Sequence, residues 1–234
     1  MRKLAVPIDV CGRCVNRFGE KLCGDRIEIV RNEAGVTAIL ADGLGGGAKA
    51  AILASLAVKM MSAMLARGEP IEEIAGMIVR SQPAGDGATA DYSAFTILQV
   101  TSGGAVFVSQ TGTPDVVFLR RGKPVGLEPV RKTVEGRIIR SGVSGAGEVD
   151  TMVAVGSGLL RAGADRELRE GWTLKQISAY MANAWTPRVT AEKLVRLLLA
   201  AGGSLSRGKP KDDFSALVFR MHRSNRQDVG EHGL

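Results

Sequence analysis

Residues 36–47 have the sequence VTAILADGLGGG, and this stretch decides the fold. Its apolar run at 36–41 predicts a buried β-strand that ends at the single carboxylate Asp42. Gly43 and three further glycines lead into an apolar segment, 48–67, that is predicted to be a helix. An acid at a strand end beside flexible backbone suits a hard metal ion, whereas the same glycines could admit a phosphate to the helix N-terminus. The stretch by itself leaves both interpretations open.

Other acids are predicted to lie close to Asp42. Residues 26–32 and 36–41 predict a hairpin, in which the start of the first strand lies beside the end of the second, so Asp25 is expected next to Asp42. Asp212 and Asp213 precede the last predicted strand. Acids gathered at strand ends repel one another unless a cation lies between them. Carboxylate and carbonyl oxygens with water are the ligands of Mg²⁺ or Mn²⁺, so the pattern favours the metal interpretation.

The remaining elements form blocks, which predicts an α+β protein of packed antiparallel sheets flanked by helices. Because strictly alternating βαβ units are absent, the pattern disfavours a dinucleotide-binding fold. A loop is predicted at 82–87, and the tail from Ser224 onward is expected to be disordered. The other predicted helices are 71–80, 173–185 and 188–201, and the other strands are 92–100, 104–110, 114–120, 136–142, 151–155 and 214–219.

Composition bounds the class of protein. A chain of 234 residues that is 45% hydrophobic can bury one full core. The net charge of +7 would suit nucleic acid, but the basic residues are scattered and aromatics are only 4%, so an acidic or phosphorylated partner is the better expectation. The longest apolar segments, near 50–66 and 189–201, contain Lys59 and Lys193 and are expected to be core helices. No signal peptide is predicted, and a cytoplasmic location is expected. Oligomeric state is left open.

Three cysteines lie close to the N-terminus: Cys11, Cys14 and Cys23. The first two form a CxxC motif, which could bind zinc or an iron–sulfur cluster or act as a redox pair, although three reduced thiols would explain it equally. A fourth ligand is not evident, because the only histidines are His222 and His232. The same scarcity of histidine argues against a His-based nucleophilic triad or a His-rich zinc enzyme.

Taken together, the motifs resemble those of the metal-dependent (PPM, type 2C) protein serine/threonine phosphatases, in the SpoIIE-like branch. The resemblance runs over about residues 19–221 and implies a phosphatase domain at 19–223, preceded by a Cys-containing segment at 1–18 and followed by a disordered tail at 224–234. It implies a four-layer α-β-β-α sandwich of two antiparallel sheets with helices outside. The motifs that carry it are Gly24-Asp25, Asp42-Gly43-Leu44-Gly45-Gly46-Gly47, Ala94–Ile97, Gly112-Thr113-Pro114, Asp150–Leu159 and Lys211–Ser215.

The resemblance also implies the site and its chemistry. Asp42 would bridge two Mn²⁺ or Mg²⁺ ions, the Gly43 carbonyl would bind one of them, and Asp212 would bind the other, with Asp213 beside it. Asp25 would bind directly or through water, and Asp25 and Asp42 would be the catalytic residues. The implied reaction is hydrolysis of phosphoserine or phosphothreonine by a metal-activated water. The implied substrate is a bacterial regulatory protein of the anti-sigma-factor antagonist type.

One position departs from the pattern. Ser157 stands where the resemblance predicts an aspartate that binds metal. A neutral hydroxyl is a much poorer ligand for a hard dication than a carboxylate, so one metal site should be weaker. Asp213, Asp150 or Asp165 could compensate. The alternative is a pseudophosphatase that binds a phosphorylated partner without turnover and responds to redox state or metal through its cysteines.

Overall fold

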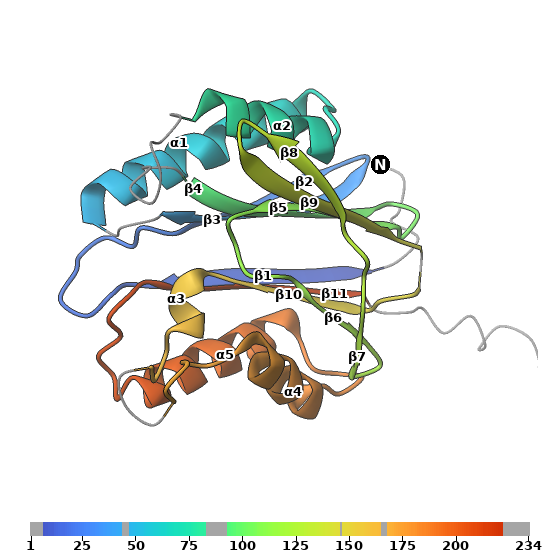
Figure 1. Ribbon diagram of the computed structural model, residues 1–234. Helices are drawn as coiled ribbons and strands as arrows, with labels where there is room; N and C mark the ends of the chain where they lie inside the picture. The colour runs from blue at the N-terminus through green and yellow to red at the C-terminus, as the bar shows by residue number, and fades with distance from the viewer. Residues whose placement is uncertain (1–6, 44–46, 83–92, 146, 165–167, 222–234) are drawn as a thin grey trace, which may run out of the picture.

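The computed structural model describes residues 7–43, 47–82, 93–145, 147–164 and 168–221. Figure 1 shows two sheets face to face, with a pair of helices covering the outer face of each. The predicted four-layer α-β-β-α sandwich is therefore confirmed. Residues 83–87 of the loop predicted at 82–87, the tail from Ser224 and motif residues 44–46 lie outside the described residues.

The sheet that contains the opening motif has six strands in the order β2-β3-β4-β5-β9-β8, and every neighbouring pair is antiparallel. The predicted hairpin is confirmed, since β2 pairs with β3 and Arg26 lies opposite Ala41. Every residue of β3 is buried, because the strand lies between an apolar core on each side. The bounds are β2 Arg26–Asn32, β3 Gly35–Gly43, β4 Ser93–Thr101, β5 Val106–Thr111, β8 Val130–Val134 and β9 Arg137–Ser144.

The second sheet has five strands in the order β1-β11-β10-β6-β7, again antiparallel throughout. Strand β1 was not predicted from the sequence, yet it pairs with β11 along its whole length. Part of the N-terminal segment 1–18 thus contributes an edge strand to the sandwich. The turn at Gly112–Pro114 connects β5 to β6, which belong to different sheets. The bounds are β1 Ile8–Val15, β6 Val117–Arg120, β7 Lys123–Val125, β10 Thr151–Val155 and β11 Phe214–Met221.

Apolar clusters hold the layers together, and three of them are seen among the described residues. One lies between the sheets and includes Leu40, Leu98, Met152 and Phe219. The other two join each sheet to its helices, α1 and α2 on the first sheet and α4 and α5 on the second. The helices are α1 Gly47–Ala66, α2 Ile71–Ser81, the single turn α3 Ser157–Leu160, α4 Leu174–Ala184 and α5 Ala191–Leu205.

Helix α1 is apolar for most of its length. By length and composition it is the one helix among the described residues that could cross a membrane, a test that core helices also pass. Its side chains at Ala54, Met61 and Leu65 are buried against the first sheet, whereas Ile52 and Leu56 on the other side are exposed. In this structure α1 is a packed outer layer of the sandwich, as the prediction of a core helix requires.

Candidate active site

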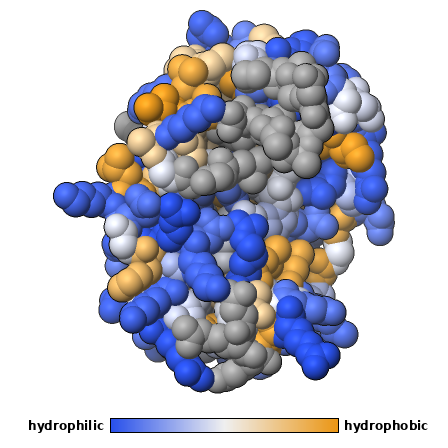
Figure 2. All heavy atoms as spheres, turned by 60° about the vertical axis from the view of Figure 1, so that its left-hand side comes forward, coloured by the Kyte–Doolittle hydropathy of each residue, from blue (hydrophilic) through white to orange (hydrophobic). Residues whose placement is uncertain are grey.

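Four strand ends meet at one edge of the sandwich. The first sheet brings Asp25, which immediately precedes β2, and Asp42 and Gly43, which end β3. The second sheet brings Ser157, two residues after β10, and the Asp212–Asp213 pair before β11. Figure 2 shows this side of the molecule, where hydrophilic side chains form a band across the middle. All the site residues predicted from the sequence, other than the cysteines, therefore lie at the same edge.

Asp25 and Asp42 form the buried centre of the site. Asp25 is 3% exposed to solvent and Asp42 is 5% exposed. The Ser157 amide donates to Asp42 Oδ2 at 2.6 Å, and the Ser215 hydroxyl donates to Asp25 Oδ2 at 2.5 Å. The Gly43 amide also donates to Asp25, at 3.3 Å. Asp25 is thus held by hydrogen bonds from β3 and β11, which belong to different sheets, and Asp42 is held by the amide of the first residue of α3.

Gly156 allows this arrangement. A Cβ placed on Gly156 would lie 2.8 Å from Asp25 Oδ2 and 3.5 Å from Asp42 Oδ2, and would also collide with Ser215 Oγ. Any side chain at this position would therefore occupy the space beside both carboxylates. The glycine keeps the end of β10 in contact with the acids of the other sheet.

The two carboxylates are electrostatically unfavourable together. Burial, and next the charge of Asp42, raise the pKa of Asp25 to about 9. Within the described part of the chain, no lysine or arginine forms an ion pair with either acid. A dication between them would remove the repulsion, so the pair fits a metal ion and the Gly43 carbonyl would be a third oxygen donor.

The Asp212 and Asp213 side chains point to other partners. Asp213 accepts hydrogen bonds from the Arg17 amide at 2.8 Å and the Gly24 amide at 2.7 Å, one on each oxygen. Asp212 forms an ion pair with Arg161. Accordingly, no group of three Asp, Glu, His or Cys side chains in the described ranges is arranged to hold a metal. Whether Asp212 and Asp213 bind metal stays a prediction.

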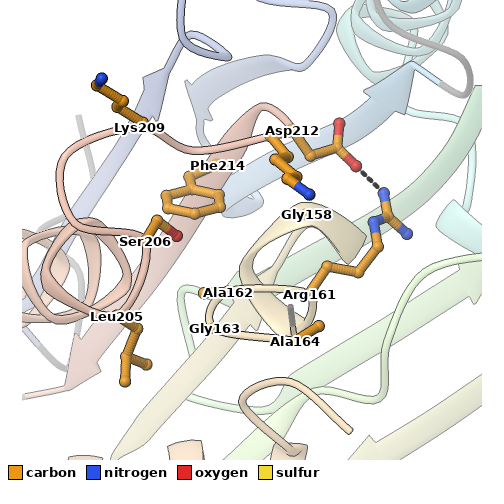
Figure 3. A pocket seen from close by; sticks show the side chains of 11 residues that line it. Gly158, Arg161, Ala162, Gly163, Ala164, Leu205, Ser206, Lys209, Asp212 and Phe214 are labelled. Atoms are coloured by element: carbon orange, nitrogen blue, oxygen red, sulfur yellow. Dashed lines mark hydrogen bonds and ion pairs between the residues drawn. The ribbon is translucent and has the colours of Figure 1, made fainter. Parts of the chain in front are cut away.

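Arg161 is the residue that sequence reasoning missed. Its Nη2 donates to Ser157 Oγ at 3.0 Å as well as to Asp212 Oδ2, so one guanidinium bridges the two positions. Figure 3 shows the Arg161 side chain extending toward Asp212 across the end of α3. The four-residue spacing from Ser157, which places both on one side of a helical turn, was the available signal.

Asp150, one of the two other acids that could replace the missing aspartate, does not take its place in the structure. Asp150 precedes β10, at the strand end away from Ser157, and it accepts hydrogen bonds from the Arg121 amide and the Thr151 hydroxyl. The structure therefore does not support compensation by Asp150. Asp165 lies outside the described residues.

A cavity of about 240 Å³ adjoins the site. Arg161 and Asp212 line this cavity, and Lys209 and Lys211 contribute further positive charge to its lining. Phe214 and Leu205 provide an apolar wall. A basic cavity next to buried carboxylates suits an anionic group attached to a larger molecule.

The cysteines are divided between two faces of β1. Cys11 lies opposite Val218 and packs in the helix-side core, whereas Cys14 lies opposite Ser215, on the face toward the first sheet. Residues three apart on a strand point to opposite faces, so the CxxC motif does not form a joint ligand pair here. Cys14 instead hydrogen-bonds with Cys23, and this bond together with burial raises the pKa of the Cys14 thiol. A metal or redox role stays a prediction that iron and zinc analysis of the protein would test.

Residues 32–222 match the family of stage II sporulation protein E (SpoIIE). The chain belongs to the SpoIIE family. This match spans Asp42, Ser157, Asp212 and Asp213, while Asp25 lies just before it. No curated protein matches the chain in sequence.

Several solved structures share the fold. The SpoIIE phosphatase domain from Bacillus subtilis is 13% identical with a TM-score of 0.67, and each chain is fully covered. RsbX, whose structure is a complex with magnesium, is 13% identical with a TM-score of 0.63 over 92% of this chain and 98% of RsbX. The RsbU and RsbW domains of Rv1364c from Mycobacterium tuberculosis are 16% identical with a TM-score of 0.70, over 94% of this chain and 63% of that one. The fold is that of PP2C phosphatase domains.

Proposed function

We propose that this SpoIIE-family chain is an Mn²⁺- or Mg²⁺-dependent protein phosphatase that hydrolyses phosphoserine or phosphothreonine on a bacterial regulatory protein in the cytoplasm. The observation that carries the proposal is the buried Asp25–Asp42 pair, which has no ion-pair partner among the described residues. The PP2C fold and a magnesium complex of RsbX support it. A substrate of the anti-sigma-factor antagonist type is part of the proposal.

Different residues of the chain would bind the metal and attract the substrate. Asp42, the Gly43 carbonyl and Asp25 would hold the metal, which when bound supplies Lewis acidity to activate a water and to neutralise phosphoryl charge. Ser157 and Ser215 fix the two carboxylates, so the site needs little reorganisation. Lys209 and Lys211 line the neighbouring cavity, where their charge attracts a phosphorylated segment of a partner.

The test is hydrolysis of a phosphoserine peptide and of an aryl phosphate by the purified full chain with Mn²⁺. We expect turnover that chelation abolishes and that Asp42→Asn reduces by on the order of a thousandfold, because it removes a central ligand of the metal. Asp150→Asn is the control, since Asp150 lies at the other end of β10. If neither the phosphoserine peptide nor the aryl phosphate is hydrolysed at millimolar Mn²⁺, the proposal is contradicted.

A second candidate function rests on Ser157 and Arg161. The neutral hydroxyl and the Arg161–Asp212 ion pair favour a pseudophosphatase that binds a phosphorylated partner without hydrolysis. This alternative predicts that the wild type binds the phosphopeptide without turnover and that Ser157→Asp produces metal-dependent activity. If the wild type is already active and Ser157→Asp changes little, the pseudophosphatase is rejected.

A further inference from the structure

The acids of the site differ in how their charges are compensated. Asp25 and Asp42 are buried beside each other and, among the described residues, form no ion pair. Asp212 is already neutralised by Arg161, whereas Asp213, like Asp25 and Asp42, accepts hydrogen bonds from neutral donors only. The adjacent pair of Asp25 and Asp42 therefore lacks a cation of the kind that Asp212 already has.

Arg161 is connected to that buried pair by two hydrogen bonds through Ser157. Its guanidinium donates to Ser157 Oγ, and the amide of the same serine donates to Asp42 Oδ2 at 2.6 Å. An arginine is charged at any pH at which the protein is folded, and its planar fork of donors matches carboxylate and phosphate oxygens. A permanent positive charge is thus fixed next to the carboxylate centre.

A dication at Asp212 would have to displace this guanidinium. Binding of this dication would break the hydrogen bond between Arg161 and Asp212, and the displaced guanidinium would still repel the ion. In return, Ser157 would offer the ion only a neutral hydroxyl as a ligand. A dication between Asp25 and Asp42 would displace no arginine or lysine of the described residues. The side chains present fit one dication and do not fit a second at Ser157 and Asp212.

We infer that the site takes a single dication, held by Asp25 and Asp42, and that the Arg161 guanidinium supplies the second positive charge of the site and binds a phosphoryl oxygen of the substrate. The part that concerns the phosphoryl oxygen rests on the proposed phosphatase function. Arg161 also lines the 240 Å³ cavity, so a phosphorylated segment lying there would meet the guanidinium on its way to Asp42. Arg161 is then a substrate-binding residue.

Counting bound Mn²⁺ tests the stoichiometry without reference to activity. The chelator-treated full chain is titrated with Mn²⁺ while free ion is measured by electron paramagnetic resonance. We expect one tight ion per chain in the wild type and in Arg161→Lys, and none in Asp42→Asn. The double variant S157D/R161Q, which restores a carboxylate and removes the guanidinium, should bind two. Two tight ions in the wild type overturn the inference, whether or not the double variant folds, and so does binding that Asp42→Asn leaves intact.

Kinetics test the second part. With an aryl phosphate, Arg161→Gln should raise KM by about tenfold or more, the loss of one charged hydrogen bond, and Arg161→Lys should recover part of it. A fall in kcat with unchanged KM would overturn the assignment of Arg161 to phosphoryl binding. If one Mn²⁺ binds but no phosphate ester is hydrolysed, the single-ion site stands and the proposed phosphatase function fails.

Discussion

Asp25 combines burial with a neighbouring like charge, and this makes the metal-free protein sensitive to pH. Its pKa is raised to about 9, chiefly by burial and then by Asp42, whereas an exposed aspartate titrates near 3.9. At a pH between these two pKa values, Asp25 is protonated in the folded chain and ionised in the unfolded chain. Stability from this group is therefore greatest at low pH and falls as pH rises toward about 9.

The variant Asp25→Asn should remove this dependence, because the amide carries no charge at any pH. In the presence of chelator at pH 8, we expect the variant to melt at a temperature at least about 3 °C higher than that of the wild type. This shift corresponds to a gain of roughly 1 kcal/mol in the free energy of unfolding for a chain of this size. At pH 5 the difference should be much smaller. Thermal unfolding followed by circular dichroism provides the measurement. Equal differences at both pH values would show that Asp25 does not titrate with a raised pKa.

At the scale of elements, the junction between β10 and α3 determines the shape of the site. Gly156 lies in this junction against Asp25 and Asp42. We predict that Gly156→Ala displaces Asp25 and Ser215, destabilises the fold by about 1–3 kcal/mol, and reduces activity by on the order of a hundredfold. Denaturant unfolding and Mn²⁺-dependent hydrolysis of an aryl phosphate measure the two effects.

Gly203 provides a matched control within α5. A Cβ at Gly203 meets no atom within 4 Å, and the residue lies inside a helix. Gly203→Ala should leave activity unchanged and stabilise the chain by about 0.5–1 kcal/mol, because alanine loses less backbone entropy in a helix. If Gly156→Ala behaves like this control, the space beside the carboxylates is not limited as the structure indicates.

For the whole molecule, the site joins the two sheets. Asp25 and Asp42 lie at the edge of the first sheet, whereas Ser215 lies in β11 of the second sheet and Ser157 begins α3, two residues after β10 of that sheet. A cation bound there should stabilise the sandwich as a unit. At a hundredfold excess over its Kd, Mn²⁺ should stabilise the chain by about 2.7 kcal/mol, which raises Tm by roughly 5–10 °C.

Differential scanning fluorimetry with and without Mn²⁺ measures this shift. Asp42→Asn should abolish it and Asp150→Asn should retain it, since Asp150 lies at the opposite end of β10. Excess chelator should reverse it. A shift of equal size in Asp42→Asn would place the bound ion elsewhere in the molecule.

Local patterns predicted most of the fold. The hairpin of β2 and β3, both large helical blocks and the buried strands β4, β10 and β11 all lie where apolar periodicity placed them. The patterns missed β1, which contains polar residues and glycine and is a strand because it pairs with β11. They also missed β7 and the single turn α3, which are too short to show a period of their own, and β8, whose residues are almost all exposed.

For the site, the sequence by itself determined which acids meet at one edge. Asp25, Asp42, Asp212 and Asp213 stand at strand ends, and antiparallel pairing brings such ends together. Only the tertiary structure decided how their charges are compensated, because those partners come from distant segments: Arg161 is 51 positions from Asp212, and Gly24 is 189 from Asp213. It likewise placed Cys11 and Cys14 on opposite faces of β1, which a CxxC spacing alone does not reveal. The local sequence pattern determines at which strand end a side chain lies. Which charged groups lie next to it depends on how the sheets and helices pack.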